Sequence, residues 1–223
     1  MRRSQDRELM DAEDVSDEDL AESYRQLQLA HRWLGNTAAV LRSLRRQPAP
    51  IQRILDIGCG QGGLLLEIRK HFHVDVIGFD LRPAPLLSPV PILSGDAVND
   101  PLPEADVAVC VMMAHHLSEA ELAGLIRNVS RSCQRFLLLD LVRHPLPLAL
   151  FRVFVAPLLG RINALDGVTS VRRAFTADEM RGIVAGALEA GNRPVRSVGH
   201  TVGPLWTRQV VDICWEPQNR QKS

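Results

Sequence analysis

Ile-Leu-Asp-Ile-Gly-Cys-Gly-Gln-Gly-Gly at residues 54–63 joins a short apolar run to a glycine-rich turn. An apolar run bounded by glycines is typical of a parallel strand that is covered on both faces. Glycines then let the backbone turn tightly and approach a ligand where a Cβ atom would collide. The stretch therefore predicts the first strand and the ligand-binding turn of an α/β protein.

The charge beside this turn indicates what kind of ligand it binds. Gly58, Gly60 and Gly63 match the generic G-x-G-x-x-G pattern, which alone is a weak signal. Asp56 lies two residues before Gly58, where it would repel the pyrophosphate of a dinucleotide. S-adenosylmethionine (SAM) carries an ammonium and a sulfonium group, so it fits this carboxylate better.

The run LDIGCGQGG at residues 55–63 resembles the first motif of class I SAM-dependent methyltransferases. The segments that follow are similar to the branch that contains ubiquinone and menaquinone biosynthesis enzymes and many natural-product methyltransferases. The likeness covers roughly residues 30–215. It implies a Rossmann-like methyltransferase fold, SAM as the cofactor and S-adenosylhomocysteine (SAH) as its product.

From residue 51 onwards the pattern alternates between strands and helices. This rhythm predicts an α/β fold with a doubly wound, mostly parallel sheet of seven strands. Two final strands separated by Gly203 and Pro204 predict a terminal antiparallel hairpin. Ser118 with Glu121, and Thr176 with Glu179, have the spacing of capping boxes that open two helices. The predicted strands are 53–57, 74–79, 90–93, 106–112, 135–141, 194–201 and 206–215.

The chain divides into three predicted parts. Residues 1–15 are polar without an apolar period, which predicts a flexible N-terminal arm. Residues 16–47 predict an N-terminal helical cap, and residues 48–218 the SAM-binding domain with a substrate-side insertion at about 143–175. The cap helices either simply cover the sheet or supply a lid over the cofactor. In the second interpretation the substrate-binding residues include Tyr24, His31 and Trp33.

Carboxylates follow three of the predicted strands, where ligands of open α/β sheets bind. Asp80 follows the second strand, and the resemblance implies that it binds the ribose hydroxyls. Asp96 in Gly-Asp-Ala resembles the residue that accepts the adenine amino group, although a single carboxylate there is also a common turn former. The predicted cofactor-binding residues are Asp56, Gly58, Cys59, Gly60, Asp80, Leu81, Asp96, Ala97 and Val111.

The segment after the fourth strand, Val111 to Leu117, resembles the family segment that lines both cofactor and substrate. Met112 is a predicted substrate contact. His115 is a candidate general base, because histidine titrates near neutral pH, whereas His116 is expected to pack under the sheet. No clustered Cys/His spacing supports a metal, so none is predicted.

Residues 145–160 are strongly apolar except for Arg152. They are too few to span a bilayer, which takes about 20 residues. They predict a hydrophobic wall over the substrate, a surface for peripheral lipid contact, or a homodimer interface in a chain that is otherwise a monomer. Around them, His144 and Asp166 are further catalytic candidates, and Arg143 and Arg173 are substrate-binding candidates. For all four residues the alternative is that they form ion pairs that hold the insertion down.

Composition excludes some classes of function. The 26 Lys and Arg residues balance 26 Asp and Glu residues, so no global field favours nucleic acid as a partner. The four cysteines show no CxxC spacing, which indicates a reducing compartment. No secretory apolar region follows Met1, so a cytoplasmic location is expected.

The sequence thus predicts an enzyme of small-molecule methylation in secondary metabolism. The expected reaction is O-methylation of a small, fairly apolar phenol, polyketide or quinone precursor. C-methylation of a related ring is an almost equally strong prediction, since the quinone-pathway enzymes that the chain resembles methylate carbon. A nicotinamide-dependent oxidoreductase and a catalytically silent SAM-binding protein remain as alternatives.

Overall fold

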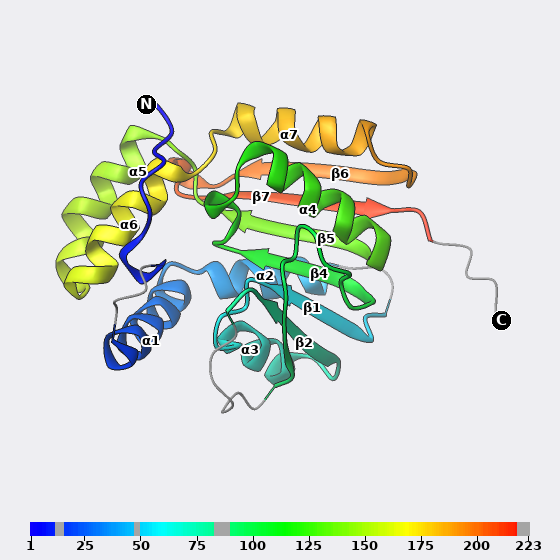
Figure 1. The fold of residues 1–223 in the computed structure, drawn as a ribbon, viewed down its shortest axis with the longest axis horizontal. Coiled ribbons are helices and arrows are strands. Elements are labelled where there is room, and N and C mark those ends of the chain that lie inside the picture. The colour runs from blue at the N-terminus through cyan, green and yellow to red at the C-terminus, as the bar shows by residue number, and fades with distance from the viewer. Residues whose placement is uncertain (12–15, 47–49, 83–89, 218–223) are drawn as a thin grey trace.

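The computed structural model describes residues 1–11, 16–46, 50–82 and 90–217, and within them the strands form one seven-stranded sheet of order β3-β2-β1-β4-β5-β7-β6 (Figure 1). Neighbours from β3 to β5 pair in parallel, whereas β7 runs antiparallel to both β5 and β6. This confirms the predicted sheet and its terminal hairpin. The strands are β1 (Arg53–Ile57), β2 (Asp75–Asp80), β3 (Ile92–Ser94), β4 (Ala105–Val111), β5 (Cys133–Asp140), β6 (Val195–Val202) and β7 (Gln209–Trp215).

The central strands are buried on both faces because helices cover both sides of the sheet. On one face Ile54 and Val109 belong to the apolar cluster under α2 (Asn36–Arg45) and α3 (Gly63–His71). On the other face Leu55 and Cys110 belong to the cluster under α4 (Glu119–Ser132) and α7 (Ala177–Glu189). Alternate residues of each strand therefore supply two cores, as the period of a strand dictates.

Two helices begin where the sequence predicts. Ser118 accepts a hydrogen bond from the Glu121 amide, and the Glu121 carboxylate accepts one from the Ser118 amide, at the start of α4. Thr176 and Glu179 form the same reciprocal pair at the start of α7. Both capping boxes are confirmed, because they depend only on residues within one turn.

Three helices gather beyond the carboxyl ends of the parallel strands: α1 (Asp17–Trp33), α5 (Pro145–Leu150) and α6 (Arg161–Arg173) (Figure 1). Between α5 and α6, a π-helical turn, η3 (Phe151–Val155), and a short 3-10 helix, η4 (Ala156–Leu158), carry apolar side chains that are largely exposed. Within the described parts of the chain, none of the helices combines the length and the apolar character that a membrane span requires.

Residues 1–11 lie against α6, which differs from the predicted flexible arm. The Ser4 amide donates to the Arg172 carbonyl (3.0 Å), and the Leu9 amide donates to Asp166 Oδ1 (2.6 Å). Polar groups of residues 1–11, whose composition predicted a free arm, form hydrogen bonds with polar groups of α6 instead. The expected parts end or begin at residues 15, 47, 48 and 218, which lie outside the described residues.

Candidate functional site

The glycine turn after β1 has a left-handed backbone and close neighbours. Gly58 has φ +71°, its amide donates to the Phe79 carbonyl (2.8 Å), and a Cβ on it would lie 2.6 Å from Met113 Cγ. Gly60 has φ +52°, and a Cβ there would lie 3.2 Å from the Tyr24 ring. Both the backbone angle and the lack of room require glycine at these positions.

Two carboxylates meet at this turn. Asp56, at the end of β1, is only 2% exposed, and burial together with the charge of Asp80 raises its pKa to about 8. Asp80, at the end of β2, accepts hydrogen bonds from the amides of Gly60 (2.8 Å) and Arg82 (2.9 Å). A cationic ligand group beside Asp56 would offset the cost of ionising this carboxyl group.

The third predicted carboxylate lies at the adjoining strand end. The Gly95 amide donates to the Asp80 carbonyl (3.0 Å), which brings the loop after β3 to the end of β2. The Asp96 carboxylate accepts from the Val98 amide (2.9 Å) and from Asn99 Nδ2 (2.7 Å). The Asp96 carboxylate therefore stabilises a turn, which is the alternative role that the sequence analysis gave for this residue. Its remaining lone pairs can still accept a hydrogen bond from a ligand.

The other predicted cofactor residues line the same edge with different exposure. Cys59 and Ala97 are half-buried, and burial raises the pKa of the Cys59 thiol. Leu81 is 67% exposed directly after β2. Val111 ends β4, and the following Met112 has φ +54°, an uncommon angle for a residue other than glycine. Strained backbone of this kind clusters at functional sites, where surrounding structure holds it in place.

Helix α1 reaches the glycine turn through Tyr24, and its role as a lid stays a prediction. Tyr24 contacts the backbone at Gly60, and His31 lies near His115, whose charge adds to burial in lowering the pKa of His31 to about 4. Trp33 is 84% exposed. It is two and a half turns from Tyr24, at about 3.6 residues per turn, so it lies on the opposite face. The prediction that Trp33 faces the site is therefore wrong.

His115 is held by a carboxylate at the end of β5. It lies in the 3-10 helix η2 (Ala114–His116), its side chain is 4% exposed, and its Nδ1 donates to Asp140 Oδ1 (2.7 Å). The His115 amide donates to Asp140 Oδ2 (2.7 Å). Burial disfavours the imidazolium, but the charge and hydrogen bond of Asp140, with a contribution from Glu8, raise the pKa of His115 to about 10. The side chain is therefore charged at neutral pH.

Glu8 is a residue of this site that sequence reasoning missed. Its carboxylate oxygens lie 3.5 Å from His115 Nε2 and 3.6 Å from His116 Nε2, and one accepts a hydrogen bond from Ser170 Oγ (2.6 Å). Burial alone would raise the pKa of Glu8, but the hydrogen bond and charge of His115 lower it. No apolar period or motif surrounds Glu8, so no local signal marks it.

Two of the catalytic candidates make contacts that hold the backbone. The Asp166 carboxylate accepts from the amides of Leu9 (2.6 Å) and Met10 (2.9 Å). His144 Nδ1 accepts from the Leu146 amide (3.2 Å) and caps α5. These contacts match the alternative in which both side chains hold the insertion in place, and a catalytic role for either residue stays a prediction.

The two arginines predicted to contact substrate tie the insertion down. Arg143 is 7% exposed, forms an ion pair with Glu179 and donates to the Ala174 carbonyl (2.9 Å). Arg173 donates to the His116 carbonyl (3.0 Å). These contacts match the alternative that the sequence left open, in which the charges hold the insertion in place.

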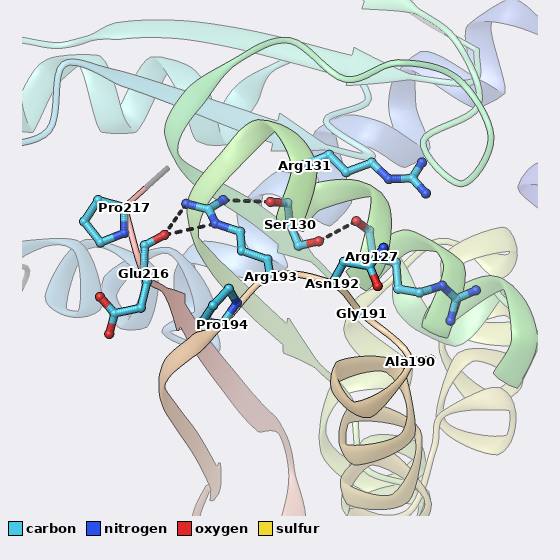
Figure 2. A pocket seen from close by; sticks show the side chains of 10 residues that line it. All are labelled: Arg127, Ser130, Arg131, Ala190, Gly191, Asn192, Arg193, Pro194, Glu216 and Pro217. Carbon is cyan, nitrogen blue, oxygen red and sulfur yellow. Dashed lines mark hydrogen bonds between the residues drawn. The ribbon is translucent and has the colours of Figure 1, made fainter. Parts of the chain in front are cut away.

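A surface cleft of about 490 Å³ lies at the opposite edge of the sheet (Figure 2). Arg193 crosses it and donates to the carbonyls of Ser130 (2.7 Å), Cys133 (2.6 Å) and Glu216 (2.8 Å). These bonds connect the end of α4 with the segments before β6 and after β7. The guanidinium is engaged in holding backbone, and the cleft is remote from the carboxyl ends of the parallel strands.

Comparison with known proteins agrees with this geometry. The family model described as "Methyltransferase domain" matches residues 54–135, which contain the glycine turn, Asp80, Asp96 and the histidine segment. No curated protein sequence matches the chain.

Solved structures share the fold at low sequence identity. The plantazolicin methyltransferase BpumL, solved with SAH, is 14% identical with a TM-score of 0.65, covering 89% of this chain and 91% of its own. The methyltransferase SibL is 18% identical with a TM-score of 0.61, covering 95% of this chain and 63% of its own. Human N-acetylserotonin methyltransferase, solved with SAM, is 18% identical with a TM-score of 0.58, covering 86% and 55%. This chain therefore spans somewhat over half the length of the last two proteins.

Proposed function

We propose that this class I SAM-dependent methyltransferase transfers a methyl group to a hydroxyl oxygen of a small, fairly apolar acceptor, such as a phenol, a polyketide or a quinone precursor. The observation that carries the proposal is the buried His115–Asp140 pair. It lies two residues from Met113, which packs against Gly58 in the glycine turn. A positively charged imidazole is thus close to the turn that we assign to the cofactor.

The cofactor would lie over the glycine turn with its charged end toward Asp56. We assign the ammonium of SAM to Asp56, the ribose hydroxyls to Asp80 and the adenine amino group to Asp96. The raised pKa of Asp56 supports the first assignment, because a cation at that place would stabilise the carboxylate. BpumL and human N-acetylserotonin methyltransferase, which share the fold, were solved with SAH and SAM respectively.

The charge of His115 determines how it would act on the acceptor. A histidine with a pKa of about 10 is a poor general base at neutral pH. An imidazolium pairs with an oxygen anion, and an opposite charge within about 4–6 Å favours the ionised form of an acidic hydroxyl. Because Glu8 faces Nε2 at 3.5 Å, the acceptor oxygen would have to take the place of this carboxylate. We infer that His115 would stabilise a phenolate. The phenolate oxygen would attack the methyl carbon of SAM in line with its bond to sulfur, that bond would break, and SAH would leave as a neutral thioether. Alignment of the two reactants supplies most of the remaining rate enhancement.

The apolar insertion supports an apolar acceptor. Helices α1, α5 and α6 enclose the carboxyl edge of the sheet, and Tyr24, His31 and Met112 are the residues we assign to the acceptor side. BpumL has also been solved with a monoazolic desmethylPZN analog, so a protein of this fold binds such a molecule. Exposed Val153, Phe154 and Leu158 keep peripheral lipid contact or a homodimer as further proposals for this surface.

The proposal is tested with purified full-length protein in two steps. Thermal unfolding is first measured with SAH, NAD and NADP at matched concentrations. A ligand at 100 times its dissociation constant adds about 2.7 kcal/mol of stability, so we expect a clear shift with SAH alone. A panel of phenols, matched amines and activated aromatic carbons is then incubated with isotopically labelled SAM, and the methylated atom is identified by mass spectrometry.

Each result separates the alternatives. Labelled methyl ethers support O-methylation, and labelled ring carbons establish the C-methylation alternative. SAH binding with no product from any acceptor class supports a silent binding protein. A shift with NAD or NADP alone would overturn the cofactor assignment.

A further inference from the structure

Three side chains from two distant segments direct donor atoms at one point. Glu8 Oε1 lies 3.5 Å from His115 Nε2, and Glu8 Oε2 lies 3.6 Å from His116 Nε2. One ligand atom of each of the three residues lies within 4.8 Å of the others. The two imidazole nitrogens and the carboxylate are therefore close enough together for one metal ion to contact all three.

The separations fit a coordination shell. A zinc ion binds nitrogen and oxygen at about 2.0–2.2 Å, so two ligands of a tetrahedral ion lie about 3.4 Å apart. The two distances to the Glu8 oxygens are within a few tenths of an ångström of that value.

Outer hydrogen bonds orient the donors as they do in metal sites. Asp140 Oδ1 accepts from His115 Nδ1 (2.7 Å), which leaves Nε2 to face Glu8. A histidine ligand almost always donates its other ring N–H to a carboxylate or carbonyl. Ser170 Oγ donates to Glu8 Oε1 (2.6 Å) and fixes the carboxylate. The ligands thus have the supporting contacts that a preformed site needs.

The backbone that carries Glu8 is fastened next to the histidines. Asp166 accepts from the amides of Leu9 and Met10, directly after Glu8. Arg3 donates to the carbonyls of His115 (3.1 Å) and Leu117 (2.6 Å), so the N-terminal segment is bonded to the histidine segment itself. Contacts on both sides of Glu8 in the chain therefore hold it at this position.

We propose that Glu8, His115 and His116 form a binding site for a divalent transition-metal cation such as Zn²⁺. Two carboxylates, Glu8 and Asp140, are buried here at 8% and 1% exposure, and a divalent cation would offset the cost of burying their charge. A donor set of two imidazoles and one carboxylate suits zinc and its neighbours better than Mg²⁺ or Ca²⁺, which prefer oxygen alone.

The site goes beyond the proposed function and stands on its own geometry. Its consequence for catalysis rests on that function: with an ion bound, His115 would be a neutral ligand, and the cation itself would take over the stabilisation of the acceptor oxygen at its open position. The His116 side chain is 29% exposed, so one side of the cluster faces toward solvent. The sequence predicted no metal because the two histidines are adjacent and the third ligand is far away in the chain.

The test is a binding measurement on the full chain after treatment with a chelator. Zn²⁺ and, separately, Mg²⁺ are titrated by calorimetry, and Co²⁺ is titrated by visible absorption, which reports nitrogen and oxygen ligands directly. We expect one equivalent of Zn²⁺ and a visible Co²⁺ spectrum. Glu8→Gln and His116→Asn each remove one ligand. We expect each to weaken Zn²⁺ binding at least about 100-fold. Loss of a residue that only hydrogen-bonds to a metal ligand already costs up to about 100-fold, and loss of a ligand itself should cost no less.

Exposed residues supply matched controls. Glu189→Gln and His73→Asn make the same chemical changes on the surface and should bind Zn²⁺ as the parent does. His116→Asn keeps Glu8 and the N-terminal contacts, so it tests the site even if Glu8→Gln disturbs folding. Absence of stoichiometric Zn²⁺ binding, or unchanged binding in both ligand variants, would overturn the proposal. SAH binding and methyl transfer are measured on the same samples, so failure of the metal site is distinguishable from failure of the methyltransferase function.

Discussion

Asp56 shows how one residue connects the fold with ligand chemistry. As the last but one residue of β1 it lies in a strand that is buried on both faces, so its carboxyl group has lost most of its hydration. A buried carboxylate without a cation is costly. The position therefore favours protonation in the free protein and ionisation when a cationic ligand is bound.

The pKa of Asp56 predicts opposite pH dependences for ligand binding and stability. The native pKa of about 8 lies above the ordinary value of 3.8. The native state then binds more protons than the unfolded state between these values, so this stabilising contribution is lost as pH rises through about 8. In the proposed assignment SAH binding needs the Asp56 carboxylate, so SAH affinity should fall by up to about tenfold per pH unit below pH 8.

Calorimetry of SAH binding and urea unfolding between pH 6 and 8.5 measure the two effects. Asp56→Asn cannot titrate, so it should flatten both profiles relative to the parent protein. Equal pH slopes in the parent and in the variant would contradict the assignment of Asp56.

Asp80 should matter more for the cofactor than for the fold. Asp80→Ala removes the acceptor for two backbone amides, which costs about 1–2 kcal/mol of stability. We expect SAH affinity to fall more than tenfold, because the ribose hydroxyls also lose their acceptor. The measurements are an SAH titration and a urea unfolding curve on the same sample.

Asp106→Ala is the matched control for Asp80. Asp106 also accepts from two backbone amides, those of Gln52 and Arg53, but at the far end of β1. It should lose similar stability with normal SAH affinity. Parallel loss of affinity in both variants would rule out a specific role of Asp80 at the ribose.

Among the elements, α7 is connected to the insertion by the ion pair of Arg143 and Glu179. The sequence predicted Arg143 as a substrate contact. Arg143, after β5, pairs with Glu179 in the first turn of α7 and also donates to the carbonyls of Ala174 and Met1. A buried guanidinium with these partners organises backbone. Its loss should therefore be felt in stability and not in cofactor binding.

Arg143→Met should lower the free energy of unfolding by about 3 kcal/mol, because Glu179 and the carbonyls lose their partner in a buried place. Arg181→Met removes the exposed partner of Asp178 on the same helix and should change stability by less than about 1 kcal/mol. Urea unfolding of both variants checks this difference, and SAH affinity should stay normal in each. A stable Arg143→Met protein with a raised KM for the acceptor would restore the substrate-binding assignment.

At the scale of the whole molecule, the N-terminal segment is docked onto a core that does not depend on it. Among the described residues, neither apolar cluster contains a side chain from residues 1–11. The segment is held by polar contacts and by Arg3, whose guanidinium lies 3.8 Å from the centre of the Phe175 ring. The domain should therefore fold without it.

A chain that lacks residues 1–10 should fold, melt several degrees lower and bind SAH within about threefold of the full chain. The expected loss follows from the hydrogen bonds to Asp166, Arg172 and Arg173, at about 1 kcal/mol each, with roughly 2–4 °C per kcal/mol for a domain of this size. Circular dichroism melting and an SAH titration measure both. An unchanged melting temperature would show that the docked segment adds no stability, and lost SAH binding would place it in the cofactor site.

The amino-acid sequence by itself determined the features that depend on neighbours along the chain. The bounds of β1, the two capping boxes, the order of strands and helices, and the terminal hairpin follow from apolar period, turn glycines and caps within a few residues. The three carboxylates at or near the ends of their strands were also predictable, because parallel strands present their carboxyl ends at one edge.

Only the tertiary structure decided which polar groups share a site. Glu8 lies 3.5 Å from His115, Asp166 accepts a hydrogen bond from the N-terminal backbone, and Arg143 forms an ion pair with Glu179. Each of these contacts joins segments that are remote in the chain and depends on how helices and loops pack over the sheet edge. Hydrogen bonds and ion pairs between remote residues leave no periodic trace in the sequence, because any nearby donor or acceptor can satisfy a polar group. The packing of helices and loops decides which partner is near, and near His115 that partner is Glu8.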